Sequence, residues 1–231
     1  MNFDLSHKIK RKWMKLRLQP IRVFCLHHVC VEFDPESMNA CDWMNVDEFK
    51  TKVQAMQQAG VEFVSLPDAY RHICKDWVRG KKYAVLTFDD GYASLKEILP
   101  WLEEQKIPAL LFINGKYLDG KSYRKNPKEK YLSKDELWAL KSPLIEIGNH
   151  GWEHVRVTEQ TNEEFEKSVE RNVDVLSNLP NYVPFWAYTY GDYTQASDDY
   201  LRAQGIVPVY IDGVKNYNDS TVVHRELLTD I

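Results

Sequence analysis

The chain has 231 residues, of which 44% are hydrophobic and 28% are charged, a composition typical of a globular protein. Its net charge of −4 gives no general case for nucleic-acid binding, and no apolar run reaches the length that a transmembrane helix needs. Aromatic residues make up 13% of the chain, with 7 Trp and 13 Tyr, which is enough for a core and also suits a sugar-binding groove.

Residues 1–20 form a basic segment, which we separate from a single domain over residues 21–231. Up to Arg22 the chain carries seven Lys or Arg residues and one acid, Asp4. We favour a solvated helix packed on the domain, because its apolar face is thin; the alternative is a peripheral contact with an anionic membrane surface. No apolar stretch follows the basic residues, so we expect no signal peptide. The cytoplasm is the expected compartment, with the inner face of the membrane as the alternative.

Cysteine usage agrees with a reducing compartment. No Cys-x-x-Cys pair is present, which argues against a zinc ribbon or a thioredoxin motif. We expect reduced, mostly buried thiols. The four cysteines are Cys25, Cys30, Cys41 and Cys74.

Beyond residue 20, apolar or β-branched runs alternate with helical patterns. Strands are predicted over residues 22–29, 61–65, 83–88, 109–113, 145–147, 184–187, 207–211 and 221–224. Helices are predicted over residues 45–59, 67–77, 93–105, 133–140, 161–179 and 194–203, several of them with capping residues at their start. This alternation predicts an α/β fold with a mostly parallel sheet, closed into a barrel of about seven to eight strands; an open doubly wound sheet is the alternative.

Two adjacent carboxylates follow the strand predicted at residues 83–88. They are Asp89 and Asp90, and Gly91 after them permits a sharp turn. The active site of a parallel α/β fold lies at the carboxyl ends of its strands. Because neighbouring side chains of an extended chain point in different directions, one carboxylate can bind a metal while the other faces a water. A turn with a helix cap is the alternative interpretation.

Two histidines follow the strand predicted at residues 145–147. His150 and His154 are separated by three residues, a spacing that can bring both imidazoles to one ion. Alone, this spacing is weak evidence, and surface histidines are the alternative. Together with Asp90 it supplies one carboxylate and two imidazoles, a set that suits zinc or another divalent transition metal.

A third feature is the pair His27 and His28, near the end of the first predicted strand. Successive side chains of a strand point to opposite faces, so only one of the two can face a barrel interior. A histidine there can donate a proton to a leaving group. A core histidine satisfied by the backbone is the alternative.

Together these motifs resemble the polysaccharide deacetylase family, also called carbohydrate esterase family four or the NodB-homology domain. Thr87-Phe-Asp-Asp-Gly91 is similar to its first motif, and His150 to His154 to its second, Asn-His-x-x-x-His. Ala187-Tyr-Thr-Tyr-Gly191 stands where the third motif usually reads Arg-x-Pro-Tyr-Gly or Ala-Tyr-Pro-Tyr-Gly. Leu26-His-His-Val29 is similar to a Tyr-His-x-Val segment that opens a bacterial subgroup. The resemblance covers residues 22–192.

The resemblance implies a distorted NodB-like barrel and a metal-dependent hydrolase. Its substrate would be an N-acetylated amino sugar in a polymer, a lipid-linked or a nucleotide-linked saccharide. Asp89 becomes the general base, and His27 the general acid with His28 as the second choice. The backbone amide of Tyr190 becomes an oxyanion donor. The implied metal is zinc, with cobalt or nickel as alternatives, and its ligands are Asp90, His150 and His154.

Four aromatic side chains are expected to offer a stacking surface for a sugar ring. Ordinary packing is the alternative for each of them, and we favour it more for Tyr188 than for Trp152. The four are Tyr92, Trp152, Tyr188 and Tyr190.

The third motif departs from the family pattern. Ala187 stands where a family arginine often steadies the catalytic aspartate, and Thr189 replaces the usual proline. The stretch Val222-Val-His-Arg225 could replace the missing basic group or supply an alternative acid, and for His224 we favour an ordinary position at a strand end over a catalytic one. The rival functions are a non-catalytic carbohydrate-binding protein on the same fold and a metal-dependent hydrolase of another C–N or ester bond.

Overall fold

The computed structural model describes residues 20–74, 80–119, 126, 128–217 and 220–228. The prediction of a basic segment at residues 1–20, with its helix or its membrane contact, therefore falls almost wholly outside the described residues. No helix within the described ranges is both long and apolar enough to cross a membrane.

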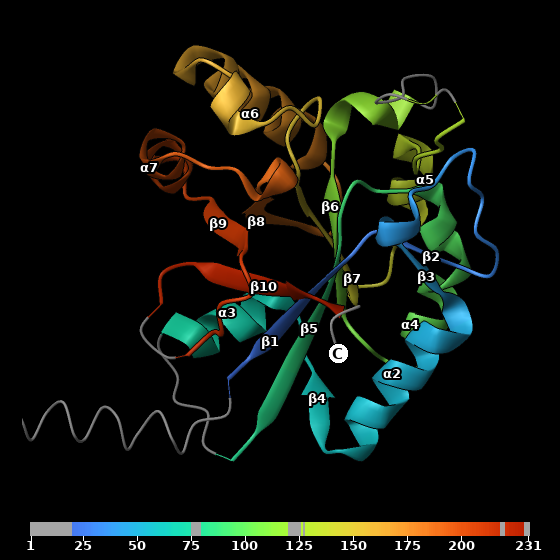
Figure 1. Cartoon of the computed structure of the whole chain (residues 1–231). Coiled ribbons are helices and arrows are strands. Elements are labelled where there is room, and N and C mark those ends of the chain that lie inside the picture. The colour runs from blue at the N-terminus through green and yellow to red at the C-terminus, as the bar shows by residue number, and fades with distance from the viewer. Residues whose placement is uncertain (1–19, 75–79, 120–125, 127, 218–219, 229–231) are drawn as a thin grey trace, which may run out of the picture.

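The described strands form a closed parallel barrel. Each strand of the ring pairs with two neighbours, and the pairing of β1 with β5 closes it, with Cys25 opposite Thr87. Figure 1 shows the helices outside this ring. The barrel prediction is confirmed, and the open doubly wound sheet is wrong. In spatial order the ring consists of β1 (Arg22–Leu26), β10 (Val223–Leu227), β9 (Val207–Ile211), β8 (Tyr182–Ala187), β7 (Ile145–Asn149), β6 (Ala109–Ile113) and β5 (Lys82–Phe88), with β4 (Val61–Phe63) paired to the start of β5.

The strand predicted at residues 22–29 is two strands. β1 ends at Leu26, whose carbonyl accepts a hydrogen bond from the Asp89 amide at 2.8 Å. The chain bends at His27 and continues as β2 (His28–Cys30), which pairs with β3 (Trp43–Asn45) in a separate small sheet. Alternation alone could not locate this bend, because the apolar residues Val29 and Cys30 resume directly after the two histidines.

The helices begin where their capping residues predict. Ser133 and Thr161 each accept a hydrogen bond from the amide three residues on, and the glutamate there returns one. The predicted helix at 93–105 is broken at Ile98, because Pro100 has no amide hydrogen and tolerates only the first turn of a helix. The helices are α2 (Val46–Gln58), α3 (Leu66–Cys74), α4 (Leu99–Glu104), α5 (Lys134–Ala139), α6 (Asn162–Leu176) and α7 (Gln195–Ala203), with short 3-10 turns η1 (Ala40–Asp42), η2 (Ala93–Glu97), η3 (Gly115–Asp119), η4 (Val157–Glu159) and η5 (Thr189–Gly191).

The apolar core lies on both sides of the barrel wall. Inside the ring, apolar side chains of the strands pack against Leu66, Ala69 and Ile73 of α3. These contacts fill the barrel interior where it faces α3. Outside it, α2, α4 and α5 cover β5, β6 and β7 with a larger cluster. The packed interior leaves the carboxyl ends of the strands as the place for polar side chains.

Candidate active site

A polar cavity of about 580 Å³ lies at the carboxyl ends of the strands. Its floor contains the side chains that follow β5 and β7, and its wall includes the turn after β8. Because parallel strands end at the same rim of a barrel, segments distant in sequence converge here. From the predicted site, the cavity is lined by His27, Asp89, Asp90, His150, His154, Tyr188 and Tyr190.

Asp90 lies between the two histidines. Its Oδ1 is 3.0 Å from His154 Nε2 and 3.4 Å from His150 Nε2, and all three side chains are buried. His150 Nδ1 donates to the Ala187 carbonyl at 2.9 Å, so the neutral ring presents the lone pair of Nε2 to Asp90. Two ligands about 2.1 Å from a tetrahedral ion stand about 3.4 Å apart, so these side chains fit a divalent cation.

The electrostatics of the three side chains agree with that fit. Burial by itself raises the pKa of Asp90, but the two imidazoles lower it well below its usual range. Burial lowers the pKa of His150, and the nearby Asp89 and Asp90 carboxylates raise it overall. The group therefore carries an ionised carboxylate in a buried place, where it needs a cation or protonated imidazoles beside it.

Buried asparagines hold the loop that carries the histidines. Asn114 Nδ2 donates to the His150 and Gly151 carbonyls. Asn172 of α6 accepts from the Gly115 amide at 2.7 Å and donates to Asn149 Oδ1 at 3.1 Å. These contacts join β6, β7 and α6 under the ligand loop and fix the direction in which its imidazoles point.

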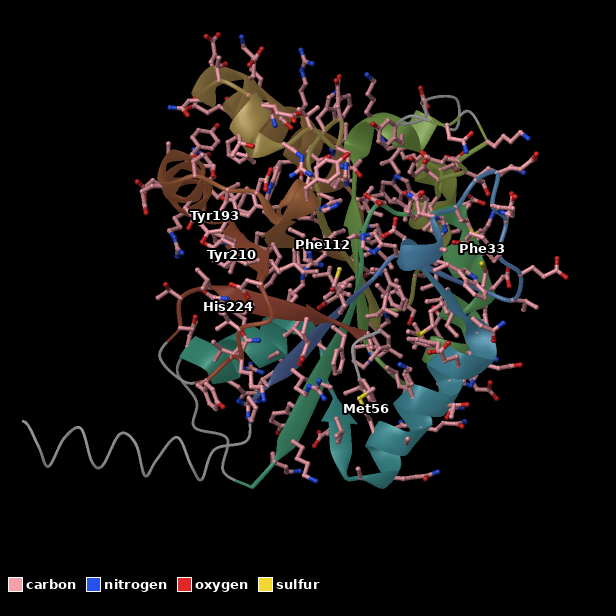
Figure 2. The ribbon with its side chains drawn as sticks, viewed as in Figure 1. Phe33, Met56, Phe112, Tyr193, Tyr210 and His224 are labelled. Carbon is pink, nitrogen blue, oxygen red and sulfur yellow. The ribbon has the colours of Figure 1, made fainter. Side chains whose placement is uncertain are left out.

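Asp89 faces the same cavity but has different partners. Arg225 Nη1 donates to its Oδ1 at 2.6 Å and Nη2 donates to its Oδ2 at 2.9 Å. The guanidinium is fully buried over the Phe112 ring, which Figure 2 labels among the strands. Burial, the largest single cause, raises the pKa of Asp89, but the charge and hydrogen bonds of Arg225 together with the charges of His150 and His27 outweigh it and lower the pKa to about 2. Arg225 thus occupies the role that Ala187 leaves open, as one interpretation of the C-terminal stretch expects.

The structure separates the candidate general acids. His27 lines the cavity and has a ring nitrogen within 4.8 Å of an Asp89 oxygen. His28 is buried beneath, stacked on Tyr92 at 3.7 Å between ring centroids. His224 bonds Asp212 at 2.8 Å, and among the described residues it is not part of the cavity wall. Its ring lies beside Tyr210, and Figure 2 labels both residues.

Tyr190 is the exposed aromatic of the cavity, with 43% of its surface accessible. Its backbone is left-handed, with φ of 58°, an unusual conformation for a bulky residue. The ring lies edge-on to His154 at 4.6 Å, and the Arg156 guanidinium lies over it at 4.1 Å. Arg156 also pairs with Asp192 at 2.6 Å, so the turn is tied on both sides of Tyr190.

The other three predicted stacking residues are placed differently. Tyr188 borders the cavity but is buried, and its hydroxyl donates to Asp198 at 2.8 Å. Tyr92 is buried and stacked against Tyr131, and Trp152 lines a second cavity beside α6. Within the described part of the chain, neither Tyr92 nor Trp152 borders the cavity of the aspartates, so of the four predicted stacking residues Tyr190 is the one with a ring exposed in this cavity.

Sequence reasoning missed two parts of the site. Cys25 lies under Asp89 and donates to its Oδ2 at 3.4 Å; its position two residues before His27 on a strand was the available signal. The second part is a polar rim from two loops, which no motif marks. It consists of Pro35, Ser37, Met38, Asn39, Asp42, Asn126 and Glu129.

Comparison with known proteins identifies the family. The sequence model for polysaccharide deacetylase matches residues 78–209, more than half of the chain, whereas a search of curated proteins finds no match. The fold is similar to IcaB from Ammonifex degensii, with 23% identity and a TM-score of 0.76 over 92% of this chain and 93% of that one. It is also similar to the Streptococcus pyogenes deacetylase PplD in complex with acetate, with 19% identity and a TM-score of 0.74 over 90% and 92%. A de-N-acetylase from Aggregatibacter actinomycetemcomitans shares 18% identity, with a TM-score of 0.72 over 90% and 95%. These likenesses show the fold, and the family match shows that the chain belongs to the polysaccharide deacetylase family.

Proposed function

We propose that this protein is a metal-dependent hydrolase that removes the N-acetyl group from an amino sugar in a saccharide. One observation carries the proposal: two adjacent aspartates reach one cavity, and each has a different main partner. Asp90 lies within 3.4 Å of two imidazole nitrogens, whereas Asp89 is held by Arg225, with His150 Nε2 farther off at 3.9 Å from its Oδ2. Such a division leaves one carboxylate for a cation and the other for proton transfer.

Asp90, His150 and His154 would hold the cation, with zinc the metal that one carboxylate and two imidazoles suit best and cobalt or nickel as alternatives. When bound, such a cation is a Lewis acid that polarises a carbonyl oxygen and makes a water more acidic. The His150 ring is held by the Ala187 carbonyl, and the backbone of its loop by Asn114, before any cation arrives. Little reorganisation is needed on binding.

The remaining side chains supply the proton transfers. Asp89 is ionised over the whole working range of pH, because its pKa is about 2, and it accepts the proton of the attacking water. The Tyr190 amide donates to the oxyanion that develops on the acetyl carbonyl. His27 donates a proton to the departing sugar amine, a poor leaving group unless it is protonated.

A saccharide also suits the walls of the cavity. Tyr190 offers an aromatic face at the mouth, and the rim offers hydroxyl, amide and carboxylate groups from Ser37, Asn39 and Glu129 for sugar hydroxyls. The printed names of two structural neighbours, a de-N-acetylase and a deacetylase in complex with acetate, support the same chemistry.

The altered third motif remains the argument for a non-catalytic carbohydrate-binding protein. Ala187 removes the expected arginine, but Arg225 reaches Asp89 from β10 with two hydrogen bonds. Thr189 replaces the proline, yet its hydroxyl donates to the Val155 carbonyl at 2.6 Å and ties the turn to the histidine loop. Both features favour the active enzyme.

Metal analysis combined with acetate release from a panel of N-acetylated saccharides tests the proposal. Replacing Asp90, His150 or His154 with Ala should remove the bound metal and the activity together. Asp89→Asn should keep the metal and lose turnover by about a hundredfold or more. Asp199→Asn, on the exposed face of α7, is the matched control and should change neither. A normal rate in Asp89→Asn would refute the assigned base, and sugar binding without acetate release from the metal-loaded protein would favour the binding protein.

A further inference from the structure

A second group of metal-binding side chains lies beside the first. One sulfur, one imidazole nitrogen and one carboxylate oxygen, from Cys25, His27 and Asp89, all lie within 4.8 Å of one another. None of them belongs to the group formed by Asp90, His150 and His154. The donor set also differs, because a thiol takes the place of one imidazole.

The strand geometry builds this group. Cys25 is in β1, and His27 stands at the bend directly after that strand, with a ring nitrogen within 4.8 Å of the Cys25 sulfur. Cys25 pairs in register with Thr87, and Asp89 is two residues beyond Thr87. The Cys25 thiol already donates to Asp89 Oδ2, with 3.4 Å between sulfur and oxygen. Sulfur and oxygen ligands of one tetrahedral zinc ion, at about 2.3 and 2.1 Å from it, stand about 3.5 Å apart.

We propose that Cys25, His27 and Asp89 form a second site for a thiol-binding divalent cation of the zinc class, and that its occupation inhibits the deacetylase. The ion would take the place of the thiol proton between the sulfur and Oδ2, and that proton would pass to solvent. The inhibition rests on the proposed function, because the ion would engage both the proposed base and the proposed acid. The binding itself does not rest on it.

Charge makes this site the weaker of the two. The Arg225 guanidinium lies 2.9 Å from Asp89 Oδ2 and repels a cation. Burial raises the pKa of the Cys25 thiol, so an incoming cation must also displace the thiol proton. The Asp90 carboxylate has two imidazole nitrogens within 3.4 Å of its Oδ1, whereas both oxygens of Asp89 already accept from the guanidinium. The first equivalent of metal is therefore expected at Asp90, and the second at Cys25 only when metal is in excess. A soft, thiol-seeking ion gains most from the sulfur.

The binding test uses Co²⁺ added to the metal-free full-length protein, because only a thiolate ligand gives a sulfur-to-cobalt charge-transfer band. The first equivalent should bind without that band, and the second should produce it. Cys25→Ser should lose the band and the second equivalent but keep the first. A protein with Cys30, Cys41 and Cys74 changed to Ser keeps Cys25 as its one thiol and should retain the band. If the unaltered protein binds excess Co²⁺ with no such band, or if Cys25→Ser retains it, the proposal is overturned whatever the variants' stability.

The inhibition test compares acetate release at one equivalent of Zn²⁺ with that at large excess, as a ratio within each protein. The unaltered protein and Cys74→Ser should slow by about a hundredfold or more in excess, the effect of losing a general base, whereas Cys25→Ser should slow much less. An equal slowing in Cys25→Ser would refute the inhibitory role. Absence of acetate release at every occupancy, with the cobalt band present, would instead refute the proposed function and leave the second site standing.

Discussion

The buried pair of Arg225 and Asp89 gives a quantitative test of the site. Arg225→Met removes the guanidinium and leaves an apolar side chain of similar reach over Phe112. Removal of one partner from a buried ion pair leaves an uncompensated charge, which typically costs about 3–5 kcal/mol. A separate value comes from Asp89 alone: its pKa is about 2 against an ordinary 3.8, a difference that corresponds to about 2 kcal/mol. We therefore expect the free energy of unfolding to fall by about 2–5 kcal/mol at neutral pH.

The pH dependence of that loss identifies its cause. A carboxyl group with a lowered pKa stabilises the fold above its unfolded pKa, and this stabilisation disappears as the pH falls from about 4 to about 2. Without Arg225, burial is left to raise the pKa of Asp89, so the variant takes up the proton at a higher pH than the unaltered protein does. The difference in stability between the two proteins should be largest at neutral pH and shrink below about pH 4. The acid limb of the rate profile should move to higher pH in the variant.

Urea denaturation of the unaltered protein, the two single variants, their double variant and a control, each over a range of pH, measures these effects. Asp89→Asn with Arg225→Met removes both charges, so the double variant should lose less than the sum of the two single variants. Arg71→Met, which removes an exposed pair with Asp68, is the control and should cost less than about 1 kcal/mol. Strictly additive losses, or a loss in Arg225→Met that does not vary with pH, would contradict the argued pairing.

Three further predictions concern other parts of the barrel. Burial raises the pKa of Glu146 to about 7, so its ionisation lowers the stability of the fold as the pH rises from 4.5 to 7. Glu146→Gln should therefore be more stable than the unaltered protein at pH 8, by up to about 3 kcal/mol, and thermal melts with no gain at that pH would contradict this. His27→Ala should slow acetate release by about a hundredfold while His28→Ala mainly lowers the melting temperature, and the reverse pattern would exchange their roles. Asn172→Ala leaves the Gly115 amide and Asn149 without the Asn172 partner. The free energy of unfolding, measured in urea, should fall by about 3 kcal/mol, and metal binding should weaken. A fall below about 1 kcal/mol would show that the network does not support the loop.

The parts of the fold that local physics determines could be predicted from the sequence. The strands at 109–113 and 207–211 have the predicted bounds, and the helices with capping boxes begin where Ser133 and Thr161 indicate. The break at Pro100 was also readable in principle, because the missing amide is a local property. The bend at His27 was not, since it depends on the hydrogen bond between the Leu26 carbonyl and the Asp89 amide, which are distant in sequence.

The candidate site divides in the same way. Motif spacing was enough to group Asp90, His150 and His154, because each follows a strand and parallel strands end at one rim. The sequence could not single out Arg225 as the partner of Asp89, because the two residues are 136 positions apart. They meet because the closed barrel places β10 beside β1. Barrel closure, which no single segment encodes, thus supplies the group that the third motif lacks.

Backbone strain shows why the motif residues alone do not make the site. Within the described residues, four non-glycine positions have positive φ, and three of them, Asp90, His154 and Tyr190, lie in the cavity wall. Such conformations cost about 1–3 kcal/mol each and persist only where the surroundings hold them. For Tyr190 those surroundings are the stacked guanidinium of Arg156 and the edge of the His154 ring. A graft of the three motifs onto another barrel would therefore bring the ligands without the Arg156 contact that supports the strained Tyr190, because Arg156 lies outside the motifs.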